Sequence, residues 1–520
     1  MLKSSWGPGI GAPGGAYLTR LVTLLRTVAP AAALAVWLTG CGSFGARDEP
    51  LNLPIEGRAE DAFAAGRTNP TAADDVVVGL AFSGGGTRAA AFSLGVLQEL
   101  DKTSVTSHTG SHSLLDRVAF VSGVSGGSVL TAYYGLKKRA ALQDFRERFL
   151  IRDAEENLST SINGINLIKA LGGGVNDAST FSKWLSDNLY DGATFADFRK
   201  TPGPRIWINA SDIYNRTAFV FGEASFISLC SDLAKYPVAD AVAASAAVPI
   251  VFTPVVIKAY PKKCTDKPPE WVERARRDPN SPPMLKAFAD ALYRYYEGSV
   301  SYVKLLDGGL VDNFGLSGFT ISRLSAGNAF APLSPEQAVK VRRLIVIVVD
   351  AGRGPAGDWV KTVEGPTGTE LVMAAADTAV AASVNAGFTA FERTMKDWQS
   401  QLVRWRCGLS PELRKRAQAP ANWNCRDLRI YVNRVGFEQL GSEREKALNA
   451  VDTRFKLPVD QVDTVIQAGH DALRANPIYQ SFLRGTGSRG PIRPKLPPKP
   501  ETTPVASVAP TATTDGLASR

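Results

Sequence analysis

The segment VSGVSGG at residues 121–127 places Ser125 between glycines, at the junction of two apolar runs. The run at 118–121 precedes it, and the run at 129–134 follows it. A strand that turns abruptly into a helix needs small residues on both sides of the turn. Such a turn leaves the residue at its tip exposed, near the positive end of the helix. The segment therefore predicts a strand–turn–helix unit with Ser125 as a candidate nucleophile, and an ordinary turn is the alternative interpretation.

Similar apolar runs alternate with helical patterns along much of the chain. Continuously apolar strands of this kind are typical of a mostly parallel sheet that helices cover on both faces. We therefore expect an α/β fold, followed by a helical portion that includes residues 371–391. The predicted strands are 76–82, 118–121, 205–210, 218–221 and 344–350, and helices are expected at 88–100 and from the glycines after Ser125 to Leu136.

Composition narrows the class of protein. The 520 residues are 44% hydrophobic and 21% charged, as in soluble globular proteins. The net charge of +9 is spread along the chain. Nucleic-acid binding would require a basic stripe interleaved with aromatic residues on one element, and no such stripe is visible. A mild positive excess equally suits an anionic membrane surface.

The N-terminus has the pattern of an export signal. An apolar run at 28–38 follows Arg20 and Arg26, and it is about half as long as the roughly 20 residues that cross a bilayer. It ends in LTGC at 38–41, which resembles the lipobox of bacterial lipoproteins. The resemblance implies that Cys41 becomes the lipid-modified first residue of the mature protein. An aspartate directly after the lipidated cysteine retains some lipoproteins in the inner membrane. Here that position is Gly42, which favours a location in the outer membrane. A signal peptide cut elsewhere, with Cys41 incidental, is the alternative.

Four further cysteines, an even number, permit disulfides in an exported protein. Adjacent pairing is the simplest arrangement, and buried free thiols are the alternative. We therefore predict the pairs Cys230–Cys264 and Cys407–Cys425.

A second glycine-rich turn, SGGGTR at residues 83–88, also follows a predicted strand and opens a predicted helix. Three glycines allow several backbone N–H groups to point in one direction and hold an anion. The spacing matches neither a P-loop nor a dinucleotide fingerprint, which leaves an oxyanion hole. Arg88 is a candidate for binding a lipid phosphate, with a solvated surface arginine as the alternative. The predicted donors are Gly84, Gly85, Gly86 and Thr87.

A carboxylate at a strand end is the candidate base. Asp307 ends the apolar run before LDGG at 306–309, where two glycines let another backbone approach closely. An ordinary Asp-Gly turn is the alternative, and Asp350 is a second strand-end carboxylate without glycine partners. The chain has only three histidines, His108, His112 and His470, for which a structural role is favoured over a catalytic or metal-binding one.

Three motifs in this order, GGGTR at 84–88, GVSGG at 123–127 and DGG at 307–309, resemble those of the patatin-like phospholipases. The Ala/Ser-rich segment at 240–249 also looks like the family's segment before its proline. The resemblance covers roughly residues 76–354. It implies a three-layer α/β/α sandwich and a lipid acyl hydrolase without a cofactor. It also implies that Ser125 is the nucleophile, Asp307 its base, and Gly84–Gly86 the oxyanion loop.

These observations give an expected organisation and function. We expect a signal peptide at 1–40, a tether at 41–74, a catalytic domain at 75–354, a helical portion at 355–484 and a disordered tail at 485–520. A charged, proline-rich insertion at about 260–283 interrupts the catalytic domain. The expected protein is a lipid-anchored serine hydrolase in the bacterial envelope, at the periplasmic face of the outer membrane, with membrane lipids as substrate. A thioesterase or transacylase with the same dyad, or a catalytically silent lipid-binding lipoprotein, are the alternatives.

Overall fold

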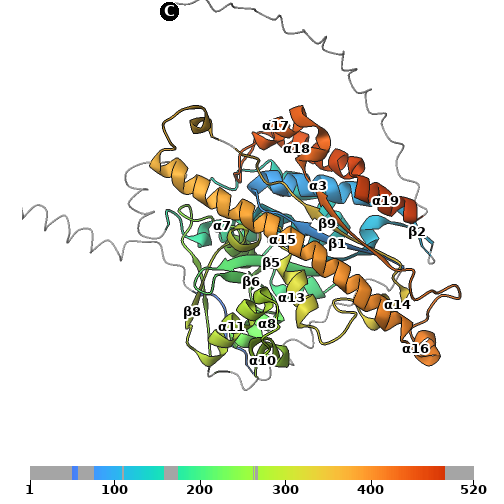
Figure 1. Ribbon diagram of the computed structural model, residues 1–520. Coiled ribbons are helices and arrows are strands. Elements are labelled where there is room, and N and C mark those ends of the chain that lie inside the picture. Colours follow the sequence, from blue (N-terminus) through green and yellow to red (C-terminus); the bar gives the residue numbers. More distant parts are fainter. Residues whose placement is uncertain are drawn as a thin grey trace, which may run out of the picture.

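The computed structural model describes residues 50–56, 75–107, 110–156, 158, 174–261, 263, 267–355 and 357–486. Within these ranges, an eight-stranded mixed sheet forms the centre of the molecule (Figure 1). Its strand order is β10-β9-β1-β4-β5-β8-β7, and β6 pairs with β5. The strands are β1 Val76–Phe82, β4 Val118–Val124, β5 Arg205–Asp212, β6 Thr217–Val220, β7 Val255–Lys258, β8 Tyr302–Asp307, β9 Arg343–Val349 and β10 Arg429–Val435.

Five neighbouring strands, from β10 to β5, run parallel, whereas β6 and β8 run antiparallel to β5. The carboxyl ends of the parallel strands therefore meet at one edge of the sheet. The glycine-rich turn after β1 and the Ser125 turn after β4 both lie at this edge. Strand β1 is buried along its whole length, and β9 is buried except at its first residue, as expected for strands covered on both faces.

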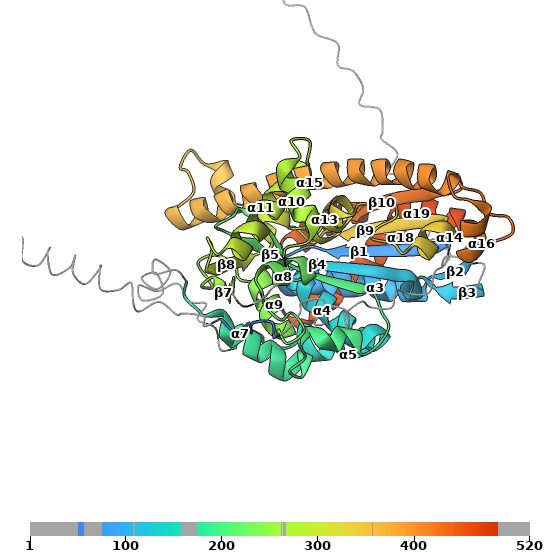
Figure 2. The same cartoon turned by 90° about the horizontal axis from the view of Figure 1, so that it is seen from below.

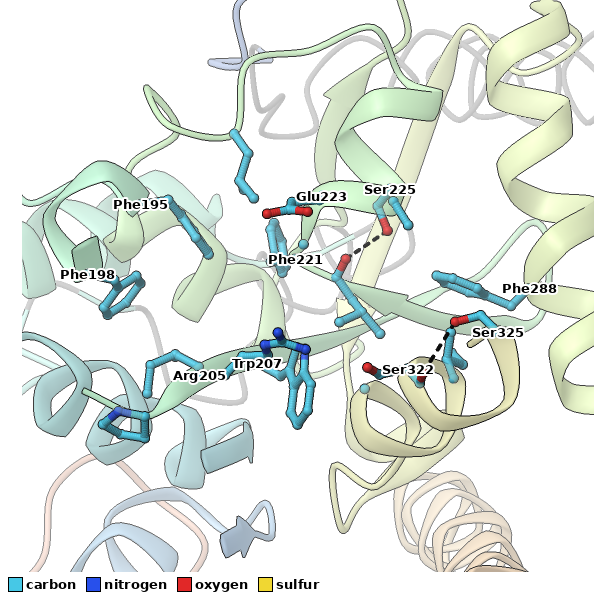
Figure 3. A pocket seen from close by; sticks show the side chains of 18 of the residues that line it. Phe195, Phe198, Arg205, Trp207, Phe221, Glu223, Ser225, Phe288, Ser322 and Ser325 are labelled. Atoms are coloured by element: carbon cyan, nitrogen blue, oxygen red, sulfur yellow. Dashed lines mark hydrogen bonds between the residues drawn. The ribbon is translucent and has the colours of Figure 1, made fainter. Parts of the chain in front are cut away.

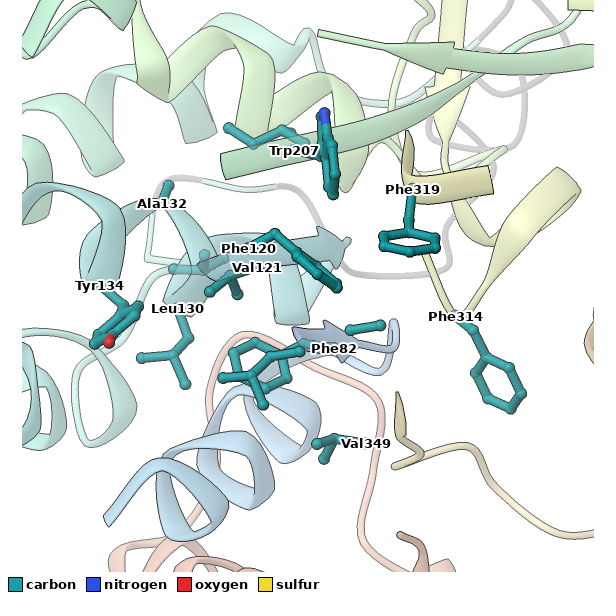
Figure 4. Packing of buried hydrophobic residues seen from close by; sticks show 14 of the residues in the cluster. Phe82, Phe120, Val121, Leu130, Ala132, Tyr134, Trp207, Phe314, Phe319 and Val349 are labelled. Atoms are coloured by element: carbon teal, nitrogen blue, oxygen red, sulfur yellow. The ribbon is translucent and has the colours of Figure 1, made fainter. Parts of the chain in front are cut away.

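Helices cover the two faces (Figure 2). Helices α3 (Gly86–Lys102), α4 (Gly126–Lys137) and α18 (Val459–Ala475) lie on one side of the sheet. Helices α12 (Gly309–Asp312), α13 (Ser317–Ser325) and α15 (Gly368–Cys407) lie on the other. On that second side an aromatic cluster fills the space under α13, with ring centroids 4.7 Å apart for Phe120–Phe319 and 5.8 Å for Phe120–Trp207 (Figure 4). The predicted three-layer α/β/α fold is confirmed.

The C-terminal portion is integrated into this core. It is largely helical, as predicted, and α15 extends the predicted helix at 371–391 to residues 368–407. Helix α18 crosses α3 so closely at Gly95 that a Cβ on this glycine would lie 2.0 Å from the Ile466 carbonyl oxygen. Strand β10 was not predicted, and it adds an edge to the sheet beside β9. Its sequence, RIYVNRV, is only partly buried and lacks the continuous apolar run of the inner strands.

Several predicted segments lie outside the described residues: the signal peptide, Cys41, most of the tether and nearly all of the C-terminal tail. Within the insertion predicted at about 260–283, residues Glu270–Arg277 form helix α10, and α11 (Pro283–Glu297) follows. None of the described helices is long and apolar enough to span a bilayer.

Candidate active site

Ser125 lies at the tip of a sharp turn between β4 and α4. Its backbone has φ 50° and ψ −126°, a conformation that a non-glycine residue adopts only under strain of roughly 1–3 kcal/mol. The glycines around it are required by close packing: a Cβ on Gly127 would lie 2.5 Å from the Ser83 carbonyl oxygen. The strained turn therefore holds the Ser125 hydroxyl in a fixed position, as a nucleophile requires.

Strand register brings Asp307 beside this serine. Val124 pairs with Asn209 in β5, and the next residue of β5, Ala210, pairs with Asp307 at the end of β8. The Ser125 hydroxyl donates a hydrogen bond to the Asp307 carboxylate. The Gly309 backbone N–H donates a second hydrogen bond to Asp307 Oδ1, at 2.8 Å. Two residues that are 182 positions apart in the sequence thus form a hydrogen-bonded nucleophile and carboxylate.

Ser245, at the end of α9 (Val238–Ser245), links the two halves of the site. Its hydroxyl accepts a hydrogen bond from the Ser125 N–H at 2.9 Å and donates one to the Asn209 carbonyl at 2.6 Å. Its own carbonyl accepts a hydrogen bond from the Gly308 N–H at 3.0 Å. The Ala/Ser-rich segment that contains Ser245 stands out in the sequence, but Ser245 itself does not. The serine content of that segment was the only available signal.

Burial raises the pKa of the Asp307 carboxyl group. Ser125 is 5% exposed and Asp307 8% exposed. Desolvation raises the pKa of Asp307 to about 6, and the hydrogen bonds from Gly309 and Ser125 partly oppose this rise. A base must be deprotonated to accept the serine proton, and its efficiency is greatest when its pKa lies near the working pH.

This pKa predicts the pH dependence of the reaction. We expect kcat/KM for a soluble ester to be constant above pH 7 and to fall about tenfold per pH unit below pH 6, as Asp307 becomes protonated. Rates measured from pH 4 to 9 test this. A plateau that extends down to pH 4.5 would indicate a base with the pKa of an ordinary exposed carboxyl group.

The glycine-rich turn after β1 lies against the serine turn. A Cβ on Gly84 would lie 3.2 Å from Ser125 Cβ. The backbone N–H groups of Gly84 and Thr87 already donate to the carbonyls of Asn313 (3.2 Å) and Arg454 (2.8 Å). By contrast, the N–H groups of Gly85 and Gly86 have no hydrogen-bond acceptor among the described residues. Of the four predicted oxyanion donors, only the N–H groups of Gly85 and Gly86, at the N-terminus of α3, therefore remain as candidates.

Gly126 offers a direct test of this loop. A Cβ at residue 126 would lie 1.9 Å from the Gly86 carbonyl oxygen. We therefore expect Gly126→Ala to displace the loop, to lower kcat at least about 100-fold through loss of oxyanion contacts, and to lower the free energy of unfolding by about 1–3 kcal/mol.

The matched control for this variant is Gly387→Ala. It makes the same change within α15, where nothing lies within 4 Å of the new methyl group, and it should leave kcat unchanged. Equal kcat values for the Gly126→Ala and Gly387→Ala variants would exclude the loop from the reaction.

Arg88 has a structural role in the fold. Its side chain is 1% exposed, and its Nε donates to the Ala351 carbonyl at 3.0 Å. Its Nη1 donates to the Val451 carbonyl at 2.5 Å. Desolvation by burial lowers the pKa of Arg88 to about 10. The predicted contact with a lipid phosphate is therefore wrong for this arrangement, because the guanidinium is enclosed and occupied by backbone carbonyls.

The alternative catalytic groups are engaged elsewhere. Asp350 forms an ion pair with Arg434, with an Oδ2–Nη2 distance of 2.6 Å. His470 lies between α18 and α3, 2.9 Å from Gln98 Oε1 and 3.3 Å from Glu99 Oε2. His112 lies in β3 (Gly110–Ser113), and His108 is outside the described residues. The described part of the chain contains no cluster of His, Cys, Asp and Glu suited to a metal ion.

The three cysteines in the described part of the chain are disulfide-bonded. Cys407, the last residue of α15, is bonded to Cys425. Cys230 is also disulfide-bonded, and the partner predicted for it, Cys264, lies outside the described residues.

A cavity of about 330 Å³ lies apart from Ser125 and Asp307, at the beginning of β5 (Figure 3). Several aromatic side chains line it, including Phe195, Trp207, Phe221 and Phe288. Arg205 lies over the Trp207 ring, 5.9 Å from its centroid. The cavity opens near the amino end of β5, whereas Ser125 lies beyond the carboxyl end of the neighbouring strand β4. It is therefore not the site of the serine.

One comparison with known proteins gives a family match over the region that contains the three motifs. Residues 80–320 match the family model described as patatin-like phospholipase. A solved structure of human GIVD cytosolic phospholipase A2 has a TM-score of 0.35 and 12% sequence identity to this chain. That match covers 82% of this chain and 64% of the human chain, so this chain spans less than two thirds of its length. A search of curated proteins finds no match.

Proposed function

We propose that this protein is a lipid acyl hydrolase that uses Ser125 and Asp307 as a catalytic dyad, because residues 80–320 match the patatin-like phospholipase family model. The hydrogen bond from the strained Ser125 to the buried Asp307 carboxylate carries this proposal. The buried His470 contacts Gln98 and Glu99 instead of Ser125, so Asp307 is the base in the proposed mechanism.

The proposed reaction has two steps. Asp307 accepts the hydroxyl proton as Ser125 Oγ attacks the ester carbonyl carbon, and the N–H groups of Gly85 and Gly86 stabilise the oxygen that becomes negative. The carbon–oxygen bond to the leaving alcohol breaks, and protonated Asp307 returns the proton to that alcohol. Water then attacks the acyl-enzyme with Asp307 again as base, which releases a fatty acid and restores the serine.

We further propose that a lipid on Cys41 anchors the protein at the periplasmic face of the outer membrane. The basic residues before the 28–38 run, the length of that run and the LTGC segment support this assignment. The anchored protein would then lie next to membrane lipids, which we propose as its substrate. Incorporation of labelled palmitate into the wild-type protein, but not into a Cys41→Ser variant, tests the anchor.

Product analysis tests the function. The purified protein is incubated with phospholipid vesicles whose sn-1 and sn-2 acyl chains carry different isotopic labels, with Ser125→Ala as the blank. We expect free fatty acid and lysophospholipid in equal amounts. Preferential cleavage of an acyl thioester would favour a thioesterase, and acyl transfer to added lysolipid would favour a transacylase. No product from any donor would favour a silent lipid-binding protein.

A further inference from the structure

A surface formed by the ends of β5, β7 and β8 combines exposed tyrosines with basic side chains. We define this tyrosine–lysine patch by Leu51, Leu53, Ile213, Tyr214, Arg216, Lys258, Tyr302 and Lys304. Its largest apolar side chains are well exposed, with Tyr214 at 66% and Tyr302 at 49%. The ion pairs between described residues involve neither Arg216, Lys258 nor Lys304.

Sheet pairing makes the patch contiguous. Lys258 in β7 lies opposite Tyr302 in β8, and Val256 lies opposite Lys304. The Ile213 N–H donates to the Lys304 carbonyl at 3.2 Å, which places the β5–β6 turn on the other side of β8. Along β8, residues 302 and 304 are exposed and residues 303 and 305 are buried, so the tyrosine and the lysine share one face.

Hydrogen bonds and cation–π contacts hold several side chains of the patch in place. Asp212 Oδ1 accepts hydrogen bonds from the backbone N–H groups of Tyr214 (3.0 Å) and Asn215 (3.1 Å), which fixes the β5–β6 turn. Two lysines lie over tyrosine rings: Lys304 is 5.7 Å from the Tyr302 centroid and Lys258 is 5.2 Å from the Tyr260 centroid. Rings and cations held in this way lose little conformational entropy on binding.

The chain that leads to the proposed lipid anchor joins the body at this patch. Asn52 exchanges hydrogen bonds with Lys258: Lys258 N–H to Asn52 Oδ1 at 2.9 Å, and Asn52 Nδ2 to the Lys258 carbonyl at 2.8 Å. The Tyr260 hydroxyl donates to the Asn52 carbonyl at 2.7 Å. Only eleven residue steps separate Cys41 from Asn52, and they span roughly 40 Å at most.

We propose that the tyrosine–lysine patch docks on an anionic phospholipid surface and orients the catalytic domain there. Tyrosine rings settle at the head-group level of a bilayer, and nearby lysines and arginines are attracted to anionic lipid. The short segment between Cys41 and Asn52 keeps this face, rather than the opposite end of the molecule, next to the membrane. Strand β8 then leads from Tyr302 at the lipid surface to Asp307, about 17 Å further along the strand. The orientation rests on the proposed anchor, and the lipid contact does not depend on the dyad.

Photo-crosslinking of the full chain tests the proposal. The protein is reconstituted into vesicles of phosphatidylglycerol and phosphatidylcholine that contain a phospholipid with a photoreactive head group, and the crosslinked residues are mapped by mass spectrometry. We expect crosslinks in the patch, and we expect them to decrease when 1 M salt shortens the screening length from about 10 Å to about 3 Å. The combined changes Arg216→Glu, Lys258→Glu and Lys304→Glu should lower the crosslinked fraction at least about tenfold.

The matched control places the same charge change at the opposite end of the molecule. The control variant combines Arg404→Glu, Lys415→Glu and Arg416→Glu. These residues lie at the end of α15 and in α16 (Pro411–Arg416), far from β7 and β8 (Figures 1 and 2). This variant should crosslink like the wild type, and so should Ser125→Ala, whatever its activity. Because Lys258 is half-buried, the double change at Arg216 and Lys304 repeats the test with exposed side chains alone. Crosslinks outside the patch, or equal crosslinking by the charge-reversed and control variants, would overturn the proposal.

Discussion

Ser125→Ala is expected to lower the rate of fatty-acid release by a factor of about 10⁴ or more, to the level of the uncatalysed blank. The change removes the attacking oxygen and the hydrogen bond to Asp307, so no acyl-enzyme can form. It keeps the Cβ, and the strained backbone at φ 50° is as accessible to alanine as to serine. Fatty-acid release and the melting temperature, measured on the same preparation, separate loss of chemistry from loss of fold.

Ser128→Ala is the matched control for this variant. Ser128 lies in the first turn of helix α4, and its buried hydroxyl donates to the Ser125 carbonyl at 2.6 Å, without contact to Asp307 in the described structure. Removing that hydroxyl should destabilise the protein by about 1 kcal/mol and leave most of the activity. A Ser125→Ala protein that still releases fatty acid would show that another group is the nucleophile.

Asp307→Asn is expected to lower kcat by about 10²–10⁴-fold, because it removes the proton acceptor and keeps the shape of the side chain. The same change should stabilise the protein at alkaline pH. Burial raises the pKa of Asp307 from 3.8 to about 6. The contribution of Asp307 to the free energy of unfolding is therefore fully present below pH 3.8. It decreases by about 3 kcal/mol as the pH rises through 6. Melting temperatures at pH 4 and pH 8 measure this: the variant should exceed the wild type at pH 8 only.

Asp350→Asn provides the comparison for Asp307. It changes the other strand-end carboxylate, which pairs with Arg434 rather than with the serine. We expect it to reduce stability and to retain activity. If Asp350→Asn abolished activity and Asp307→Asn did not, the roles assigned to the two carboxylates would have to be exchanged.

The parts of the structure that the sequence predicts are those governed by local patterns. Continuous apolar runs mark β1 and β9, and glycines around Ser125 mark the sharp turn, because only small residues fit there. Strand β10 was missed because its outer-edge position leaves several residues half-exposed, which permits arginine and asparagine in the strand.

The details of the site depend on contacts between distant residues. Three consecutive glycines look alike in the sequence, yet among the described residues only Gly85 and Gly86 keep free N–H groups, because Asn313 and Arg454 occupy the neighbouring ones. Arg88 follows the glycines like an anion-binding residue, but the carbonyls of Ala351 and Val451 enclose it. Carbonyls supplied by residues more than 200 positions away leave no pattern near residue 88.

Labelling with a fluorophosphonate tests the dyad most directly, since the reagent phosphonylates only an activated serine. Mass spectrometry of the intact and digested wild-type protein should show one added phosphonyl group, at Ser125. Labelling should be at least about 100-fold slower in Asp307→Asn and should decrease below pH 6, where Asp307 becomes protonated. A wild-type protein that is not labelled at Ser125, or that is labelled there at the same rate without the Asp307 carboxylate, would contradict the Ser125–Asp307 dyad.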